Sequence, residues 1–191
     1  MSLMGMKRVN EIFYSLQGEG KNTGRAAVFI RFSGCNLACP FCDTDFEAYV
    51  EMSDEQIVAA AQAFPARFVV LTGGEPALQV DASLVEKLHA SGFEIAMESN
   101  GTRPVVDGID WLTVSPKGKV VVERCNELKC IYVGDDSVED FGICADFYYL
   151  QPCDVGDAQR NRQITQACTD YICRHPRWRL SLQTHKLAGF K

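Results

Sequence analysis

The sequence of 191 residues contains no run of about 18 apolar residues, so it predicts no transmembrane helix. Its opening, MSLMGMKRV, is too short and too lightly apolar for a signal peptide, and we interpret part of residues 1–6 as an expression scar. Basic charge is not in excess either, because 19 Lys and Arg residues stand against 25 Asp and Glu residues. These absences predict a cytoplasmic protein that attaches to no membrane and binds no nucleic acid directly.

The chain also lacks internal repeats and low-complexity tracts. With 47% apolar residues it can bury a substantial core, so we expect a single domain over residues 1–191. What recurs is a short apolar run, usually ending in polar or glycine-containing residues: AVFIRFSGC, RFVVLTGGEP, FEIAMESNG, WLTVSPK, LKCIYV, FYYLQP and RLSLQTHK. Nearly continuous β-branched and aromatic stretches of this length predict buried strands of a parallel sheet.

Helical patterns lie between several of these runs. Ser53 and Gln56 form the capping box of one expected helix, and further helices are expected over residues 83–91 and 157–174. Right-handed parallel crossovers would bring SGC, TGGEP, ESNG, SPK and LQP together at the carboxyl edge of the sheet. A closed eightfold barrel typically needs about 250 residues, so the sequence predicts an α/β fold with an incomplete, open parallel barrel of about six core strands.

Nine cysteines are many for this length, and their number is odd. A secreted, disulfide-bonded fold is one interpretation, but such folds are usually shorter and have smaller apolar cores. We therefore favour reduced thiols together with a metal site. The cysteines outside the main cluster show no second CxxC unit and are expected to be small buried hydrophobic residues: Cys125, Cys130, Cys144, Cys153, Cys168 and Cys173.

Cys35, Cys39 and Cys42 form a C-x3-C-x2-C cluster that lacks a fourth cysteine. Structural zinc normally takes four ligands, and none of the three histidines is close in sequence, so zinc would need a distant fourth ligand. A dithiol redox pair needs only CxxC and leaves Cys35 unexplained. An iron–sulfur cluster held by three thiolates keeps one iron open to substrate or cofactor. This last interpretation favours catalysis over electron storage.

The segment CNLACPFC after a first apolar run, followed by TGGEP, resembles the radical S-adenosylmethionine (SAM) superfamily. In that superfamily SAM binds the open iron of a [4Fe–4S] cluster and is cleaved to a 5′-deoxyadenosyl radical. In more detail, EIFYSLQGEG, FIRFSGCNLACPFCDTDF, LTGGEPALQ, ESNGT, SPK, LQP and QTHKLAGFK resemble the 7-carboxy-7-deazaguanine synthase family. The resemblance spans nearly the whole chain and implies an open barrel of the radical SAM type.

The resemblance implies a lyase that converts 6-carboxy-5,6,7,8-tetrahydropterin to 7-carboxy-7-deazaguanine with release of ammonia, in the queuosine and deazapurine pathway that serves tRNA modification. The implied cofactors are a [4Fe–4S] cluster, regenerated SAM and Mg²⁺. An electron donor such as flavodoxin or ferredoxin, and a homodimer, are also implied. The alternatives are a glycyl-radical-enzyme activase, against which LQGEG, Arg31 and QTHK argue, and a non-catalytic iron–sulfur or zinc module.

The same resemblance implies a role for each residue of the site. Cys35, Cys39 and Cys42 would hold the cluster, and Thr44 would bind Mg²⁺. The residues implied to bind SAM are Phe41, Cys42, Asp43, Gly74, Ser99, Ser115, Pro116, Lys117 and Gln151. The residues implied to bind substrate are Leu16, Gln17, Gly18, Glu19, Arg31, Thr72 and, through its main-chain carboxylate, Lys191.

Arg31 is notable without any resemblance, because it interrupts the apolar run VFIRF. An unpaired guanidinium in such surroundings is expensive to bury, so it needs an anionic partner. That partner is either a carboxylate of the protein, in a structural salt bridge, or the carboxylate of a substrate. The resemblance favours the substrate.

Overall fold

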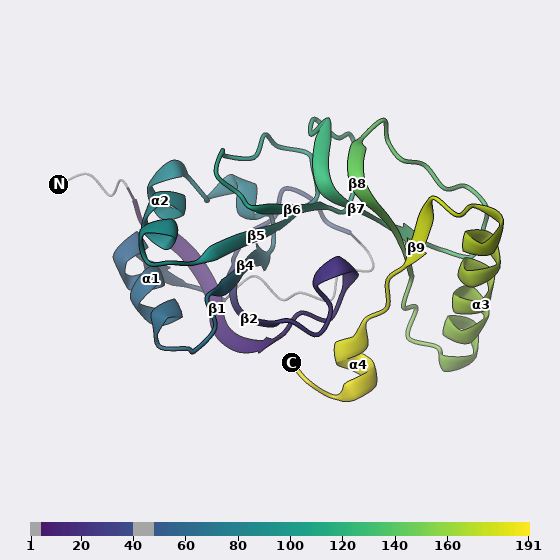
Figure 1. Cartoon of the computed structure of the whole chain (residues 1–191), viewed down its shortest axis with the longest axis horizontal. Helices are drawn as coiled ribbons and strands as arrows, with labels where there is room; N and C mark the ends of the chain where they lie inside the picture. The colour runs from purple at the N-terminus through teal and green to yellow at the C-terminus, as the bar shows by residue number, and fades with distance from the viewer. Residues whose placement is uncertain (1–4, 40–47) are drawn as a thin grey trace.

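A computed structural model describes residues 5–39 and 48–191, and within them nine strands form one curved sheet (Figure 1). The strands follow the order β3-β1-β2-β4-β5-β6-β7-β8-β9 across the sheet. Their bounds are β1 Lys7–Leu16, β2 Ala26–Phe32, β3 Val50–Met52, β4 Phe68–Gly73, β5 Glu94–Ser99, β6 Trp111–Val114, β7 Arg124–Tyr132, β8 Cys144–Pro152 and β9 Trp178–Leu180. The two end strands, β3 and β9, do not pair with each other, so the predicted open barrel is confirmed.

Every pairing from β2–β4 to β8–β9 is parallel, as predicted. In contrast, β1 runs antiparallel to both β2 and β3. The last predicted strand is partly wrong. Of that run, only Arg179 and Leu180 join the sheet, as part of β9, and the short helix α4 (Thr184–Ala188) follows. The chain leaves the sheet here because the Thr184 amide donates to the carbonyl of Gly18, 3.0 Å away on the segment after β1.

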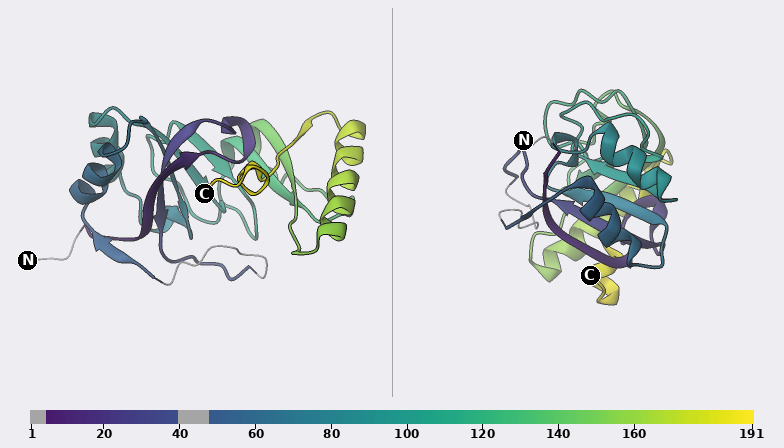
Figure 2. Two further views of the ribbon diagram at one scale, coloured as in Figure 1. Left: turned by 90° about the horizontal axis from the view of Figure 1, so that it is seen from below. Right: turned by 90° about the vertical axis from the view of Figure 1, so that its left-hand side faces the viewer.

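The three longer helices cover the outside of the sheet, with α1 (Asp54–Gln62) and α2 (Ala82–Ala90) at one end and α3 (Ala158–Arg174) at the other (Figure 2). Two single turns of 3₁₀ helix, η1 (Gly20–Asn22) and η2 (Pro76–Leu78), complete the described elements. The predicted capping box of α1 is present, and the other two predicted helices agree with α2 and α3 to within about a residue at each end. No helix among the described residues is long and apolar enough to cross a membrane.

Alternation along the strands decides which side chains face the inside of the barrel. On β2, Ile30 packs into the core beneath α1 and α2, while Phe29 belongs to a second apolar layer with β4 and β5. Arg31 lies two residues after Phe29 and therefore points to the same face of the sheet. The same period brings Thr72 of β4 and Lys129 of β7 to the cavity that Arg31 lines. The strands thus supply an apolar layer inside the barrel and polar side chains nearer their carboxyl ends.

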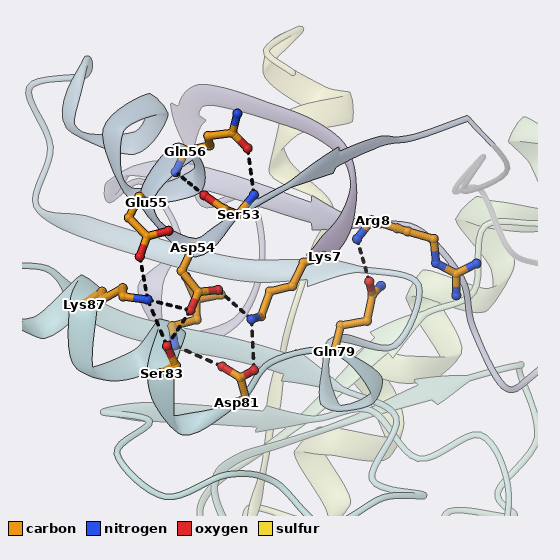
Figure 3. Close-up of polar contacts among 11 residues, drawn as sticks. Lys7, Arg8, Ser53, Asp54, Glu55, Gln56, Gln79, Asp81, Ser83 and Lys87 are labelled. Carbon is orange, nitrogen blue, oxygen red and sulfur yellow. Dashed lines mark hydrogen bonds and ion pairs between the residues drawn. The ribbon is translucent and has the colours of Figure 1, made fainter. Parts of the chain in front are cut away.

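A buried ion-pair cluster ties β1 to the amino-terminal ends of α1 and α2 (Figure 3). Lys7, only 2% exposed, places Nζ 2.6 Å from Asp54 Oδ1 and 3.0 Å from Asp81 Oδ2. The second oxygen of Asp54 accepts from Ser83 Oγ at 2.6 Å and from Lys87 Nζ at 3.1 Å. Burial raises the pKa of Asp54, but these hydrogen bonds and the charge of Lys7 outweigh it and leave the pKa lowered. The cluster fixes two helices to the strand that borders the cysteine segment.

Candidate active site

At the carboxyl ends of the parallel strands, the barrel opens into a cavity of about 480 Å³. Each of the five segments predicted to meet here, SGC, TGGEP, ESNG, SPK and LQP, contributes at least one lining residue. These segments lie far apart in sequence and converge because their strands run parallel. The convergence predicted for this edge of the sheet is therefore confirmed.

The cavity gathers most of the residues to which the sequence assigned a role. Both described cysteines of the cluster, Cys35 and Cys39, line it. Of the residues expected at SAM, the lining includes Gly74, Ser99, Ser115, Lys117 and Gln151, whereas Pro116 is buried beside it. All the residues expected at the substrate line it as well: Leu16, Gln17, Gly18, Glu19, Arg31, Thr72 and Lys191. Phe41, Cys42, Asp43 and Thr44 lie outside the described residues.

The TGGEP segment is joined directly to the start of the cysteine segment. The Gly74 amide donates to the Phe32 carbonyl at 2.9 Å, and the Glu75 amide donates to the Gly34 carbonyl at 3.0 Å. A Cβ atom on Gly74 would lie 1.9 Å from that Gly34 oxygen, so only glycine fits here. The two loops therefore form one continuous wall of the cavity.

Glu75 connects this wall to the ESNG segment, and it is completely buried. Its Oε1 accepts from Ser99 Oγ at 2.9 Å, and its Oε2 accepts from the Asn100 amide at 2.7 Å. The Ser115 amide in turn donates to the Ser99 carbonyl at 2.8 Å. The Glu75 carboxylate and the Ser99 carbonyl together fix the relative positions of three of the converging loops.

Both flanks of the cysteine segment are attached to β1. On one side, the Ser33 amide donates to the Arg8 carbonyl at 2.9 Å. On the other side, Asn10 Nδ2 donates to the Ala48 carbonyl at 2.7 Å, and β3 begins with Val50 opposite Val9. The strand that the buried Lys7 cluster anchors therefore also supports the segment that carries the cysteines.

A group of charged side chains forms the polar floor of the cavity. Lys129, which is 5% exposed, forms an ion pair with Glu19 and lies 3.6 Å from Glu98 Oε2. Burial lowers the pKa of Lys129, but the charges of Glu19, Glu98 and Glu127 outweigh it and raise the pKa above its usual value. Burial raises the pKa of Glu127, the third carboxylate of this group. Of this group, Glu19, Glu98 and Lys129 line the cavity, so two carboxylates and one ammonium border it.

Amide side chains extend this floor. Gln17 Nε2 donates to Glu98 Oε1 at 2.8 Å, while Gln151 Nε2 and Gln183 Nε2 each donate to Glu19 Oε1 at 3.1 Å. Burial raises the pKa of Glu19, but the charge of Lys129 and these hydrogen bonds leave it well below its usual value. Glu19 is therefore held as a carboxylate that accepts hydrogen bonds from several directions.

Arg31 has an anionic partner within the protein and still lines the cavity. Its Nη1 lies 2.8 Å from Glu11 Oε1, and its guanidinium lies over the Phe13 ring, 5.1 Å from the centroid. Lys191 pairs with the other oxygen of Glu11, and its main-chain oxygen accepts from Ser15 Oγ at 2.7 Å. The structural salt bridge considered for Arg31 is thus present, and its side chain remains 34% exposed.

Comparison with known proteins identifies the family. Residues 29–118 match the radical SAM superfamily. Over 189 residues the chain is 50% identical to the 7-carboxy-7-deazaguanine synthase of Bacteroides thetaiotaomicron, an alignment that covers 97% of this chain and 100% of that protein. The chain belongs to the 7-carboxy-7-deazaguanine synthase family. The resemblance inferred from the motifs is thereby confirmed.

Two further members of this family support the assignment. The 7-carboxy-7-deazaguanine synthase of Bradyrhizobium diazoefficiens is 44% identical, with 96% of this chain and 98% of that protein aligned. The crystal structure of QueE from Escherichia coli superposes with a TM-score of 0.75 at 30% identity, covering 93% of this chain and 94% of that one. Membership of a radical SAM lyase family favours the enzyme over the activase and the non-catalytic module.

The described residues fit an iron–sulfur cluster of the radical SAM type. Cys35 and Cys39 are soft thiol donors at the wall of the cavity, beside the close approach of Gly74 to Gly34. Within residues 5–39 and 48–191, no three His, Cys, Asp or Glu side chains come together as a metal-binding group, so the zinc interpretation gains no additional ligands there.

The cysteines outside the cluster differ in burial, and Cys153 is half-buried, so the expectation that it is buried is wrong. Cys125, Cys130 and Cys168 are buried, as expected, and burial raises the pKa of each thiol, to about 12, 12 and 11 respectively. Cys144 and Cys173 are exposed, so the expectation that they are buried is wrong. Each lies in a strand or helix at a position that faces away from the core, which their spacing alone did not indicate. All the described cysteines are free thiols.

Sequence reasoning missed several residues of the site. Glu98 and Lys129 stand within apolar runs, as Arg31 does, and the same argument about buried charge could have found them. Glu11 and Gln183 lie in motifs that were recognised, but their contacts to Arg31 and Glu19 depend on the tertiary fold. His185 also lines the cavity, on α4.

Proposed function

We propose that this protein is a 7-carboxy-7-deazaguanine synthase, which converts 6-carboxy-5,6,7,8-tetrahydropterin to 7-carboxy-7-deazaguanine with release of ammonia. The observation that carries the proposal is the 50% identity, over 97% of this chain, to a relative of that name. Its support in the structure is that Cys35 and Cys39 line the same cavity as the charged floor. In the cell, this reaction belongs to queuosine and deazapurine biosynthesis and so serves tRNA modification.

The wall of the cavity would hold the cofactors. Cys35 and Cys39, with Cys42, would bind the [4Fe–4S] cluster, and the set expected at SAM comprises Phe41, Cys42, Asp43, Gly74, Ser99, Ser115, Pro116, Lys117 and Gln151. When bound, these cofactors supply the radical that removes hydrogen from the substrate. The part played by the chain is to orient the reactants and to exclude water from the radical.

The floor would hold the substrate, a pterin that carries a carboxylate. A pterin offers amine and ring N–H donors, and Glu19 is a carboxylate kept ionised by Lys129 to accept them. Leu16, Gln17 and Gly18 precede Glu19 in the same turn, and Thr72 lies at the exit of β4. Arg31 would bind the substrate carboxylate by exchanging part of its contact with Glu11. The main-chain carboxylate of Lys191 would complete this set beside Arg31.

Mg²⁺ is the third proposed cofactor, with Thr44 as its protein ligand. Mg²⁺ takes oxygen ligands and keeps several waters, so it needs few groups from the protein. Bound near the substrate, it would orient and polarise the carboxylate that Arg31 also contacts.

The remaining proposals concern the partners of the protein and its cellular compartment. The cluster needs a one-electron donor such as flavodoxin or ferredoxin, and free thiols together with oxygen-sensitive chemistry are typical of the cytoplasm. We also propose a homodimer, following the family.

The proposal is tested by anaerobic reconstitution with iron and sulfide, followed by an assay with reductant, SAM, Mg²⁺ and 6-carboxy-5,6,7,8-tetrahydropterin. We expect 7-carboxy-7-deazaguanine and ammonia in equal amounts. The Cys39→Ala variant should show no turnover. A fully cluster-loaded wild-type enzyme that forms no product would refute the assignment.

A further inference from the structure

The side-chain amide of Asn100 lies next to the first cysteine of the cluster. Asn100 is 6% exposed, and its Nδ2 lies 4.0 Å from Cys35 Sγ and 3.1 Å from Asn36 Oδ1. The same sulfur also accepts from the Leu37 amide at 3.4 Å. Cys35 therefore has one donor from its own loop and a second from a segment 65 residues further along the chain.

The orientation of the Asn100 amide follows from its other partners. Its Oδ1 accepts from the Thr102 amide at 2.9 Å and from Thr102 Oγ1 at 2.7 Å. A backbone N–H can only donate, so the oxygen of the Asn100 side chain must face Thr102 and the nitrogen must face Cys35. Asn36 Nδ2 donates to Thr102 Oγ1 at 2.8 Å and closes the ring of contacts.

The backbone of Asn100 is also held in place. Its amide N–H donates to the buried carboxylate of Glu75 at 2.7 Å, and Glu75 is joined to Gly34, next to Cys35, through its own amide. The donor and the sulfur are thus attached to the same rigid wall. Such a fixed arrangement is what a second-sphere contact requires if it is to act on a metal ligand.

We propose that Asn100 is a positioning residue that donates a hydrogen bond to the Cys35 thiolate and raises the reduction potential of the cluster. Hydrogen bonds to ligand sulfurs are among the features that set the potential of an iron–sulfur cluster. Reduction adds negative charge to the cluster and its sulfurs, so a donor stabilises the reduced form more than the oxidised form. Asn100 thereby makes the cluster easier for the electron donor to reduce. This inference rests on the cluster of the proposed function but not on the identity of the substrate.

The experiment is an anaerobic redox titration of the reconstituted protein, without substrate, followed by electron paramagnetic resonance of the reduced cluster. In Asn100→Leu, which keeps the volume and removes the donor, the ratio of reduced to oxidised cluster at a fixed potential should fall about tenfold, or about 59 mV for a one-electron couple. In Asn100→Asp the added negative charge should lower the potential further. A role in folding alone would reduce the iron content and leave the potential of the loaded fraction unchanged.

Asn126→Leu is the matched control, because Asn126 Oδ1 also accepts from a backbone amide, that of Leu112, at 2.8 Å. Its Nδ2 faces Asp146 and not a cysteine. Its cluster should titrate as in the wild type. If Asn100→Leu takes up little iron, Thr102→Val is the second test. It removes the hydrogen bond from Thr102 Oγ1 to Asn100 Oδ1, so it should lower the reduction potential, by less than removal of the Asn100 amide would. The inference is overturned if the Asn100 variants keep the wild-type potential, or if Asn126→Leu shifts as far as Asn100→Leu. A wild-type protein with the expected potentials but no ring-contraction activity would refute the proposed function alone.

Discussion

Among the residues that the structure describes, two lysines are buried, and their surroundings differ. Lys7 is 2% exposed and lies outside the barrel, between β1 and the ends of α1 and α2 (Figure 3). Lys129 is 5% exposed and lies at the inner face of β7, against the cavity. Each pairs with carboxylates distant in sequence, so each joins parts of the fold that only tertiary structure brings together.

The difference lies in how the carboxylates are used. Around Lys7, each oxygen of Asp54 accepts from protein donors, and Asp81 caps α2 through the Leu84 amide. Around Lys129, the three carboxylates exceed the single ammonium, and Glu19 and Glu98 border the open cavity. A cluster packed against helix ends away from the cavity serves as an anchor, whereas a charged cluster that lines the cavity is suited to a ligand. The comparison therefore predicts a loss of stability from one site and a loss of activity from the other.

Lys7→Met should have the largest effect. It leaves the buried Asp54 without its main partner, and breaking a buried pair in this way costs about 3–5 kcal/mol of unfolding free energy. Chemical denaturation of the cluster-free protein measures the loss. Lys87→Met is the control, because Lys87 is 40% exposed and contacts the same Asp54, so it should destabilise the protein much less than Lys7→Met does. Equal losses in the two variants would show that Lys7 is not the anchor.

Lys129→Met should act mainly on catalysis. Without the ammonium, Glu19 and Glu98 repel each other and lose the geometry that accepts the substrate. We expect kcat/KM to fall about 100-fold, or about 2.7 kcal/mol of transition-state stabilisation. Steady-state assays of the cluster-loaded enzyme measure this, with Lys87→Met again as the control. An unchanged kcat/KM would remove the proposed difference between the two lysines.

The sequence predicted the edge of the sheet at which these chemistries meet, because polar segments such as TGGEP and ESNG follow apolar runs, and parallel strands end together. It predicted neither the strand β1 nor its direction. Nothing local distinguishes a parallel from an antiparallel neighbour, and the pairing of Tyr14 with Val28 depends on the whole hairpin. The same limit explains why the anchor around Lys7 was not foreseen.

The floor of the cavity was partly predictable. Glu19 was assigned to the substrate from a motif, but its partner Lys129 lies 110 residues later within the run LKCIYV. One charged residue in an apolar strand indicates an inward-facing ion pair without indicating its partner. Arg31 illustrates the same point, because the sequence required an anion beside it and the structure supplies Glu11.

Arg31→Ala should have a smaller effect than Lys129→Met, since it removes one contact to the substrate carboxylate and leaves the floor intact. We expect KM for 6-carboxy-5,6,7,8-tetrahydropterin to rise about tenfold, with kcat nearly unchanged. Arg25→Ala is the control, because Arg25 pairs with Glu94 over the Phe68 ring and does not line the cavity. If KM stays at the wild-type value, Glu11 is the only functional partner of Arg31, and the salt bridge is structural.

Ser53→Ala should have the smallest effect. It tests whether a change next to the buried cluster around Lys7 affects the cavity. Ser53 Oγ accepts from the Gln56 amide at 3.3 Å, and Gln56 Oε1 accepts from the Ser53 amide at 2.8 Å, so the variant removes half of the capping box next to Asp54. Loss of such a cap costs about 1 kcal/mol. Because α1 lies outside the barrel, kcat/KM should not change. A marked loss of activity at full cluster content would mean that the anchor and the cavity are coupled, and that the two buried lysines do not act independently.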